Sequence, residues 1–500
     1  MPRSIDLLRV AFAYPSAGEL APVFSDVSLR FTPGWTAIVG PNGSGKSTLA
    51  GLLAGDLRPT AGSVVSSPGD LSVARVSQLV EVLVPAVRAF ADRGGGEAVR
   101  WRAELGLTAG DLDRWPTLSP GERKRWQLGA ALATGPDVLV LDEPDAHLDE
   151  PGRRFVLEAL RRFRGIGVLV SHRRDVLEAL AKRTVFLEGG AAYDYACAFG
   201  EARESRERDR IAGQDARRRL RAERDQLTAS LHELKARQRG AERQKIAGNR
   251  MKSARDSDAR SFAGTFAASK ASGALARRAQ ATESRRARIE AQIERVPFTR
   301  ELGGSIVLRA GSAAGSRVAT LVTDAVMAGD ARVLGHTSLT LERTDRVRLA
   351  GPNGSGKSTL LRRLANSAGS NLVLHLEQSL TDRERRRAVD SVRALGPADR
   401  GRALALLAAL GSDPDKVVRA ELPSPGEAKK LLLVRALVAE PVALFLDEPT
   451  NDLDLPTTER LERALVAYEG ALVLVTHDDS LARATTERTW TIREGLVELA

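Results

Sequence analysis

The sequence lacks several features that define other classes of protein. Cysteine occurs once, at Cys197, which excludes an internal disulfide and any zinc or iron–sulfur site built from several cysteines. The longest apolar runs, such as "GIGVLV" and "PVALFL", are interrupted by charge far short of the ~18–20 residues that a membrane span needs. The N-terminal "MPRSIDLLRV" has no cationic segment followed by a long apolar stretch. We therefore expect a protein without a transmembrane segment or export signal, located in the cytoplasm.

Four fifths of the chain also lack any excess of basic over acidic residues. Residues 201–300 hold 26 Lys and Arg against 14 Asp and Glu, whereas the other 400 residues hold 49 against 50. The formal net charge of +11 therefore originates in one middle segment. A basic block between two neutral parts indicates a polyanionic partner.

A nine-residue sequence, "GPNGSGKST", occurs twice, at 40–48 and at 351–359. Each copy is followed, in the same order, by a Gln, a Ser-Pro-Gly-Glu, an aliphatic run ending in Asp-Glu-Pro, and an aliphatic run ending in His, at offsets of 300 to 311 residues. Such aliphatic runs, separated by amphipathic stretches, are typical of buried parallel strands that alternate with helices. A length of 500 residues also exceeds one ordinary domain. We predict two copies of one α/β domain, at residues 1–198 and 303–500.

The segment between the two copies, residues 199–302, has the composition of a long helical hairpin. Proline is absent from Gly152 through Val296, and the helix-favouring residues Arg, Ala, Glu and Gln are abundant from residue 201 onward. Apolar residues at heptad spacing predict an antiparallel coiled coil. They are Leu220, Leu227, Leu231 and Leu234 in the first helix, and Leu275, Ala279, Thr282, Ile289, Ile293 and Val296 in the second. About 45 residues per helix would extend roughly 65–70 Å.

The tip of this hairpin, Gly248–Gly273, has a different composition. Its Gly and Ser residues predict a break in helicity, and it carries Phe262 and Phe266 among five Lys and Arg. Basic and aromatic side chains together are typical of nucleic-acid binding. The simpler alternative is a solvated, charged spacer whose rings only close the end of the hairpin.

Each repeated loop has the form G-x-x-x-x-G-K-S/T, in which backbone N–H groups can surround a polyphosphate. Lys46 or Lys357 would contact the terminal phosphates, and Ser47 or Ser358 would offer a hydroxyl to Mg²⁺. Two copies, each between a strand and a helix, exclude a chance match. The loop residues that we expect to bind nucleotide are Gly40, Pro41, Asn42, Gly43, Ser44, Gly45, Lys46, Ser47 and Thr48, with Gly351, Pro352, Asn353, Gly354, Ser355, Gly356, Lys357, Ser358 and Thr359.

Two carboxylates end an aliphatic strand in each half: Asp142 and Glu143 in "VLVLDEP", and Asp447 and Glu448 in "ALFLDEP". Burying unpaired charge is costly, so a structural role alone does not explain them. The aspartate is suited to hold Mg²⁺ through water, and the glutamate is suited to polarise an attacking water.

A histidine ends a further aliphatic run in each half, His172 in "VLVSH" and His477 in "LVLVTH". Either one alone would more often be ordinary packing, but both share an offset of 305 residues with the carboxylates. Each ring can donate a hydrogen bond to a γ-phosphate. We therefore expect the catalytic residues to be Glu143, Glu448, His172 and His477.

The two Ser-Pro-Gly-Glu sequences, at 119–122 and 424–427, are good helix starts, with Ser at the N-cap and Glu completing a capping box. Read alone, that explanation is adequate. A helix N-terminus with a hydroxyl and a glycine that permits close approach also binds phosphate well. Together with the other motifs, this favours nucleotide contacts from Ser119, Gly121, Ser424 and Gly426.

This set of motifs resembles the ATP-binding-cassette ATPases. Over nearly the whole chain, tandem cassettes with a long charged linker and no membrane span look like the ABC-F family, translation factors and antibiotic-resistance proteins that act on ribosomes. The resemblance implies an α/β fold of two P-loop cassettes joined by a helical hairpin, and hydrolysis of ATP to ADP and phosphate with ATP and Mg²⁺ as cofactors. It also implies a linker that contacts the ribosome, through large-subunit rRNA and tRNA, near the peptidyl-transferase region.

By the same resemblance, the cassettes close face to face within one chain, which we expect to be a monomer. The Lys46 loop would meet Ser424 and Gly426, and the Lys357 loop would meet Ser119 and Gly121. The metal would be held by Ser47, Gln78, Asp142, Ser358, Gln378 and Asp447.

The chain departs from the family pattern at several positions. Asp145-Ala146 stands where the second copy has Thr450-Asn451, and Arg173 follows His172 where Asp is usual. Pro423 replaces the Leu that usually precedes the second Ser-Pro-Gly-Glu.

An aromatic ring is also missing from one copy. Tyr14, 26 residues before Gly40, resembles the ring that stacks on adenine, whereas the same offset before Gly351 gives Ala325. No Phe, Trp or Tyr lies from Arg309 to Ala350. The two sites should therefore be unequal.

Two other classes of protein remain as alternatives. A tandem ATPase subunit of a membrane importer would have similar motifs, but such subunits normally join their cassettes directly. ATPases of DNA repair or chromosome organisation place their coiled coil inside a cassette. The basic hairpin between complete cassettes favours the ribosome-acting family.

Overall fold

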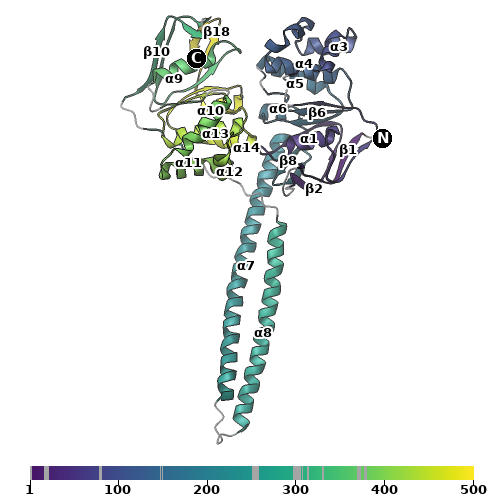
Figure 1. Cartoon of the computed structure of the whole chain (residues 1–500), viewed down its shortest axis with the longest axis vertical. Helices are drawn as coiled ribbons and strands as arrows, with labels where there is room; N and C mark the ends of the chain where they lie inside the picture. Colours follow the sequence, from purple (N-terminus) through teal and green to yellow (C-terminus); the bar gives the residue numbers. More distant parts are fainter. Residues whose placement is uncertain are drawn as a thin grey trace. The chain divides into compact units, whose positions relative to one another are not determined.

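The computed structural model describes residues 3–15, 22–77, 82–146, 148, 150–250, 258–296, 306, 308–311, 315–328, 331–368, 373–376 and 380–499. The chain forms two compact units, one made of Met1–Ala202 with Arg300–Ala500, and one made of Arg203–Thr299. The first unit contains an N-terminal half and a C-terminal half, each built on its own sheet (Figure 1). None of the helices in the described ranges has a stretch long and apolar enough to cross a membrane.

The N-terminal half is built on a six-stranded sheet in which only the last pair of strands, β8 and β9, is antiparallel. In spatial order its strands are β5 (Val73–Val76), β6 (Val138–Asp142), β7 (Ile166–Val170), β3 (Gly34–Val39), β8 (Arg183–Glu188) and β9 (Ala191–Tyr195). A three-stranded antiparallel sheet contains β2 (Phe24–Phe31), β1 (Ser4–Phe12) and β4 (Ala61–Ser67). The helices are α1 (Lys46–Ala54), α2 (Pro85–Asp92), α3 (Gly96–Glu104), the 3₁₀ segment η1 (Ala109–Thr117), α4 (Pro120–Leu132), α5 (Glu150–Arg162) and α6 (Arg174–Leu180).

The C-terminal half repeats this order. Its six-stranded sheet contains β15 (Val373–Leu376), β16 (Ala443–Asp447), β17 (Ala471–Val475), β14 (Arg346–Ala350), β18 (Arg488–Arg493) and β19 (Leu496–Leu499). Two antiparallel pairs are formed by β10 (Arg317–Thr323) with β13 (Thr337–Glu342), and by β11 (Val326–Ala328) with β12 (Ala331–Leu334). The helices are α9 (Lys357–Ser367), α10 (Asp382–Arg393), α11 (Pro397–Ala409), α12 (Pro414–Arg419), α13 (Pro425–Val438), α14 (Leu455–Val466) and α15 (Asp479–Thr485). The predicted α/β fold class is confirmed.

Both faces of each six-stranded sheet are covered by aliphatic packing, because successive strand residues point to opposite faces. In β6, Val138 and Val140 pack with α1, whereas Leu139 and Leu141 belong to the cluster that includes Trp126 of α4. The corresponding strand β16 divides in the same way between two clusters of the C-terminal half. Strands β6 and β16 are thus apolar up to their last residue, which is an aspartate in each.

The strand register brings the functional motifs to one edge of each sheet. Asp142, the last residue of β6, is paired with Val170 at the end of β7, and Ile38 of β3 is paired with the same valine. The 40–48 loop, the carboxylates and His172 each follow one of these neighbouring strands. Carboxyl ends of adjacent parallel strands are where open α/β sheets bind ligands.

The second unit is a hairpin of two long helices, α7 (Phe199–Arg250) and α8 (Asp258–Arg295), which lie side by side (Figure 1). The predicted heptad residues are on its inner side: Leu231 and Ile289 are buried, and Leu227 is partly buried. Ion pairs also join the helices, Arg285 with Glu223 at 2.7 Å and Lys235 with Glu283 at 3.6 Å. Apolar contacts between the helices and flanking charge pairs are typical of a coiled coil.

The predicted break in helicity across Gly248–Gly273 is wrong for most of that segment. Helix α7 continues to Arg250, and α8 already begins at Asp258; residues 251–257 lie outside the described part of the chain. A single Gly costs only about 1 kcal/mol in a helix, and the frequent Ala residues of this segment have the highest helix propensity. Glycine and serine content alone was therefore a poor guide to the end of the helix.

Candidate active site

The repeated loops connect β3 with α1 and β14 with α9. The residue before each helix is a glycine in the left-handed region, with φ of 95° at Gly45 and 97° at Gly356. A Cβ atom at Gly45 would lie 2.5 Å from Val23 Cγ1, so the conformation and the close packing both require glycine. The helix N-terminus that follows has backbone N–H groups without intrahelical partners, which favours anion binding.

The loop lysines lie inside the loops that precede them. Lys46 Nζ donates to the carbonyl oxygens of Gly40 and Pro41, both at 2.9 Å, and Lys357 makes the two equivalent bonds at 2.8 Å. Burial lowers the pKa of Lys46, although nearby carboxylates, Asp454 foremost, oppose this shift. Each ammonium group is therefore held inside the loop that we predict to bind polyphosphate.

The expected metal-binding oxygens of the N-terminal half lie together. The Ser47 side chain hydrogen-bonds Asp142, which is 3% exposed, and burial raises the pKa of Asp142. Hydroxyl and carboxylate oxygens are the ligands that Mg²⁺ prefers. The residues of this half therefore fit the ion. In the C-terminal half, Asp447 is equally buried at the end of β16.

Two other groups bear on the metal and phosphate assignments. The predicted ligands Gln78 and Gln378 lie outside the described residues. Within the described ranges, the hydroxyls of Ser44 and Ser355 are buried in the loops without a hydrogen-bond partner. A buried hydroxyl left without a partner is costly, and a phosphate oxygen would satisfy it.

Each glutamate that we predict to be catalytic follows its strand in a left-handed backbone conformation, with φ of 49° at Glu143 and 45° at Glu448. This uncommon conformation for a non-glycine residue is typical of functional sites. The histidine of the same half faces each carboxylate, with His172 Nε2 3.4 Å from Glu143 Oε1 and His477 Nε2 3.6 Å from Glu448 Oε1. The structure thus brings together the predicted catalytic pair in both halves.

The two glutamates differ in environment. Glu448 is 4% exposed, and burial raises its pKa to about 7, although the backbone N–H of His477 opposes this by donating to the carboxylate. The side chain of Glu143 is 24% exposed. The same motif therefore gives two chemically unequal carboxylates.

A cavity of about 860 Å³ contains residues from both halves. Lys46, Glu143 and His172 line it from the N-terminal half, and Ser424 and Gly426 line it from the C-terminal half. The Lys46 loop is thus brought together with the Ser-Pro-Gly-Glu helix of the other copy. Ser119 and Gly121 are not among the residues that line this cavity, so it does not unite the Lys357 loop with its expected partners.

Direct bonds also cross between the halves at this cavity. The backbone N–H of Asn42 donates to Asp454 Oδ2 at 2.8 Å, and the Asn42 side chain donates to the carbonyl of Asp452 at 3.4 Å. The same carbonyl oxygen would lie 2.4 Å from a Cβ atom at Gly426, so glycine is required there by close backbone approach.

Both Ser-Pro-Gly-Glu sequences form the capping boxes that the sequence predicts. Ser424 Oγ accepts from the Glu427 N–H at 3.3 Å and donates to its carboxylate at 2.9 Å, and Ser119 makes the corresponding bonds with Glu122. The capping box therefore satisfies each serine hydroxyl without a ligand. It also orients the hydroxyl at a helix N-terminus, as phosphate binding requires.

Tyr14 lies beside the N-terminal loop, as expected for an adenine-stacking ring. Its hydroxyl is 2.9 Å from Thr48 Oγ1, the ring packs edge-on against Phe12, and half of the side chain is exposed in the cavity. A tyrosine that is half exposed beside the loop is available for stacking on a base.

The predicted equivalent of Tyr14, Ala325, is wrong. Phe12 pairs with Phe24 in the N-terminal half, and Val326 pairs with Leu334 in the C-terminal half. Phe24 and Leu334 both pack near the last glycine of their loop, which makes Phe12 and Val326 equivalent positions. Tyr14 lies two residues after Phe12, so its equivalent is Ala328, another alanine. The offset failed because the connection between the paired strands is four residues shorter in the C-terminal half. The absence of a ring is unaffected.

Sequence reasoning missed one pair of buried lysines next to the site. Lys124 and Lys429 share the 305-residue offset, which was the available signal, and both are 2% exposed. Lys124 Nζ donates to the Ser77 carbonyl at 2.6 Å, whereas Lys429 Nζ lies 2.9 Å from Asp452 Oδ2. Burial lowers the pKa of Lys124 to about 8. Both buried lysines thus bond to residues that follow strands of the sheet.

Similar proteins align with more than nine tenths of the chain. Residues 24–146 and 334–451 match the family model described as "ABC transporter". The chain is 32% identical to the tylosin resistance ATP-binding protein TlrC of Streptomyces fradiae, over 95% of each protein. It is 30% identical to the ATP-binding protein Uup of Caulobacter vibrioides, over 93% of this chain and 74% of that protein. It is 28% identical to the ribosome protection protein VmlR of Bacillus subtilis, over 92% of this chain and 82% of that protein.

We predict that Tyr14→Ala weakens ATP binding at the N-terminal loop by about tenfold, because stacking on a base contributes roughly 1–3 kcal/mol. The measurement is equilibrium ATP binding in a Lys357→Ala background, which leaves the N-terminal loop as the main binding site. Tyr14→Phe is the matched control: it keeps the ring, loses the bond to Thr48, and should bind nearly as well as the parent. Equal affinities for Tyr14→Ala and Tyr14→Phe would contradict a stacking role.

A second prediction concerns Asp145, which is 5% exposed and accepts a hydrogen bond from Ser171 at 3.0 Å. Burial raises its pKa to about 6 from an ordinary 3.8, so the folded state holds this proton more tightly than the unfolded state. The contribution of Asp145 to stability therefore falls as pH rises from about 4 to about 6, by at most about 3 kcal/mol. Asn cannot ionise and avoids this loss.

Thermal unfolding at pH 4.5 and pH 7.5 checks this prediction. The midpoint of Asp145→Asn minus that of the parent should be higher at pH 7.5 than at pH 4.5. Asp26→Asn, at a carboxylate whose side chain is 70% exposed, should show no comparable change. If the difference in unfolding midpoint between Asp145→Asn and the parent were the same at both pH values, ionisation of Asp145 would not lower the stability of the protein as predicted.

Proposed function

Because the chain belongs to the ABC-F family of ATP-binding-cassette ATPases, we propose that it is an ATP-driven factor that binds ribosomes and modulates translation or protects ribosomes from antibiotics. The ATPase part is supported above all by one observation: the Lys46 loop, Glu143 and the Ser424 helix face one cavity. The ribosomal part is supported by relatives named for ribosome protection and tylosin resistance, which align with 92% and 95% of this chain. We assign the cassettes to residues 1–198 and 303–500, and the linker to residues 199–302.

The proposed chemistry is positioning and charge stabilisation around the terminal phosphate. Lys46 or Lys357 would exchange its loop carbonyls for phosphate oxygens. Glu143 or Glu448 would accept a proton from the attacking water, and the facing histidine would donate a hydrogen bond to the γ-phosphate. Each Ser-Pro-Gly-Glu helix would complete the site of the other cassette, so the Lys357 loop would be completed by the helix that begins at Ser119.

We assign Mg²⁺ to the serine and aspartate at each strand edge. They are Ser47 and Asp142, and Ser358 and Asp447, with Gln78 and Gln378 as further ligands. When bound, the ion would neutralise charge on the phosphate oxygens. The protein supplies the hydroxyl and carboxylate and excludes bulk water from the buried aspartate.

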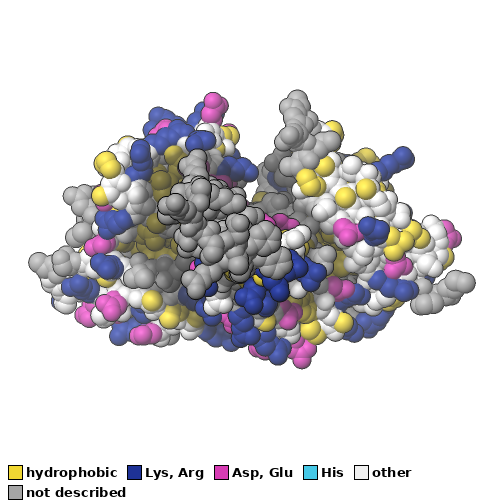
Figure 2. Space-filling view, turned by 90° about the horizontal axis from the view of Figure 1, so that it is seen from below, with side chains coloured by type: hydrophobic (Ala, Val, Ile, Leu, Met, Phe, Trp, Pro, Cys, Tyr) yellow, Lys and Arg dark blue, Asp and Glu magenta, His cyan; other side chains and the backbone are white. Residues whose placement is uncertain are grey.

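The linker is the proposed ribosome-binding element, with large-subunit rRNA and tRNA as its partners. Its basic surplus is carried on exposed side chains such as Arg218, Arg219 and Arg221. Figure 2 shows Lys and Arg side chains gathered near the middle of the face seen from below. Phosphate neutralisation by such side chains gives affinity without sequence specificity.

The tip of the linker would position the protein on the ribosome. Phe262 and Phe266 are candidates for stacking on exposed bases near the peptidyl-transferase region. Cassette pairing within one chain fits a monomer, and action on ribosomes fits a cytoplasmic location. Sedimentation with membranes instead of ribosomes would favour the importer alternative.

We predict that changing Glu143 and Glu448 together to Gln abolishes ATP hydrolysis, by about 100-fold or more, and retains ATP binding, because Gln keeps the size but cannot accept the proton. The variant should accumulate on ribosomes when ATP is present. Phosphate release and co-sedimentation with ribosomes measure both effects. The matched control changes the exposed Glu97 and Glu469 to Gln and should behave as the parent. Hydrolysis at the parental rate in the double variant would mean that these residues are wrongly assigned.

We also predict that the linker tip acts separately from ATP chemistry. Replacing residues 249–272 with a short Gly-Ser turn should leave basal ATP turnover nearly unchanged and retain salt-sensitive ribosome binding, but should remove any effect on translation or drug protection. Changing Arg218, Arg219 and Arg221 to Gln should do the reverse, weakening binding and reducing its salt dependence. If the shortened protein protected ribosomes as well as the parent, the tip would be only a structural cap.

A further inference from the structure

Three arginines distinguish the N-terminal half from the C-terminal half near the cavity. They are Arg153 of α5, Arg173 at the N-cap of α6, and Arg174 in the first turn of α6. At the shared offset of 305 residues, the C-terminal half has Thr458, Asp478 and Asp479. Basic side chains thus stand where the other copy has neutral or acidic ones.

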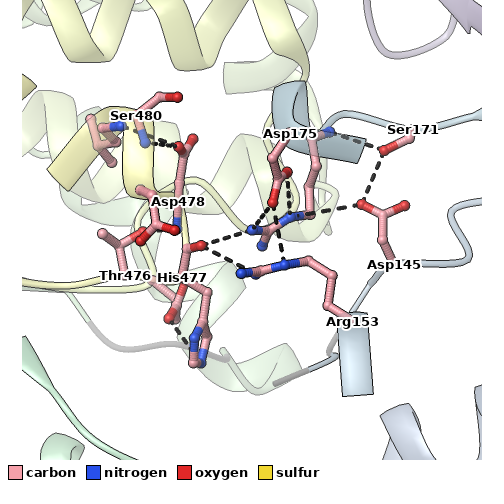
Figure 3. A network of polar contacts seen from close by, with 12 residues as sticks. Asp145, Arg153, Ser171, Asp175, Thr476, His477, Asp478 and Ser480 are labelled. Carbon is pink, nitrogen blue, oxygen red and sulfur yellow. Dashed lines mark hydrogen bonds and ion pairs between the residues drawn. The ribbon is translucent and has the colours of Figure 1, made fainter. Parts of the chain in front are cut away.

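Two of these arginines hold one backbone oxygen of the other half. Arg173 Nη2 donates to the carbonyl of His477 at 2.7 Å, and Arg153 Nη1 donates to the same oxygen at 3.3 Å (Figure 3). Arg174 also crosses between the halves, but it contacts Glu462 on α14, at 2.8 Å, instead of the His477 segment. The crossing contacts therefore have two separate targets.

The guanidinium of Arg173 is fixed within its own half. It donates twice to Asp175, from Nε and from Nη2, at 3.2 Å each, and lies 4.0 Å from Asp145. Ser171 Oγ accepts from the Arg173 N–H at 3.0 Å and donates to Asp145 at 3.0 Å. Asp175 also pairs with Arg153, at 3.3 Å (Figure 3). A planar group with five donors can serve these acceptors and the His477 carbonyl together.

The same position in the C-terminal half is committed to a local role. Asp478 caps α15 by accepting from the N–H groups of Ser480 and Leu481, at 2.9 and 3.1 Å. Arginine cannot accept such bonds, and Arg173 makes no side-chain cap on α6. The substitution thus exchanges a helix cap for a long side chain that reaches the other half.

The segment that Arg173 holds also carries the groups that contact Glu448. The N–H of His477 donates to Glu448 Oε2 at 3.4 Å, and its ring faces the same carboxylate. A bond to the His477 carbonyl therefore restrains both contacts.

We propose that Arg173 is a positioning residue for the catalytic site of the C-terminal half, holding the His477 segment against Glu448 from the other cassette. Hydrolysis at the Lys357 site would then require the N-terminal cassette to be docked. This inference rests on the proposed catalytic roles of Glu448 and His477.

The test uses the full chain with Glu143→Gln, so that turnover reports the Lys357 site. Adding Arg173→Ala should lower kcat about tenfold or more and change KM for ATP less than about threefold, because a misplaced catalytic group affects the reaction more than binding. Arg174→Ala is the matched control: it removes a crossing ion pair but leaves the His477 contact, and kcat should stay within about twofold. An unchanged kcat for Arg173→Ala, or equal losses for both variants, would overturn the proposal.

A second measurement is independent of turnover. Backbone amide exchange of residues 476–480 should be about threefold or more faster in Arg173→Ala, and unchanged in Arg174→Ala. Unchanged exchange in Arg173→Ala would also overturn the proposal. If Glu143→Gln alone abolished all turnover, the proposed assignment of hydrolysis to separate sites would fail, while the exchange measurement would still decide the role of Arg173.

Discussion

The pairing of three neighbouring parallel strands decides where the loop lysine, the strand-end carboxylates and the histidine of each half lie. In each half the strand that precedes the phosphate loop, the strand that ends in aspartate and the strand that ends before histidine are adjacent and end at one edge. The strands that end in aspartate and the strands that end before histidine are apolar up to their ends, whereas β3 and β14 also carry polar residues such as Thr36 and Arg348. A shift of one residue in this register would move Asp142 into the aliphatic layers and turn its neighbours to the opposite faces.

Within that shared frame, local substitutions make the two halves unequal. Glu448 is nearly enclosed, whereas Glu143 is partly open to the cavity. Lys429 pairs with Asp452 and donates to the carbonyl of Asn451, and the residue of the N-terminal half that corresponds to Asp452 is His147. The two sites thus share the phosphate loop and differ in charge, burial and hydrogen bonding around it.

Much of the fold and of the site follows from the sequence, because the motifs are contiguous and occur twice. The loops, the strand-end carboxylates and the capping boxes are each specified by fewer than ten neighbouring residues, and the strand order then brings them together. The contact of Arg173 with His477 joins residues 304 positions apart, and no local pattern specifies it. Arg173 was visible as a departure from the family pattern, but its acceptor is a backbone oxygen, which carries no sequence signal.

Two errors have a related cause, since both depended on counting or composition instead of packing. Ala325 was misplaced because surface connections change length without affecting the strands that they join. The start of α8 was misplaced because a single Gly costs a helix only about 1 kcal/mol, and the intervening Ala residues favour the helix. Connection lengths and helix boundaries therefore depend on packing that a local sequence pattern does not specify.

The hydrogen bond from Arg173 to the opposite half has an evolutionary consequence. In a symmetric dimer of a single cassette, one mutation appears in both subunits, so an arginine at this position would face a second arginine across the two-fold axis, and both helices would lose their caps. Duplication within one gene removes that restriction. One copy can keep Asp478 as a cap while the other acquires a side chain that reaches across, and the halves can diverge into complementary roles without a second gene.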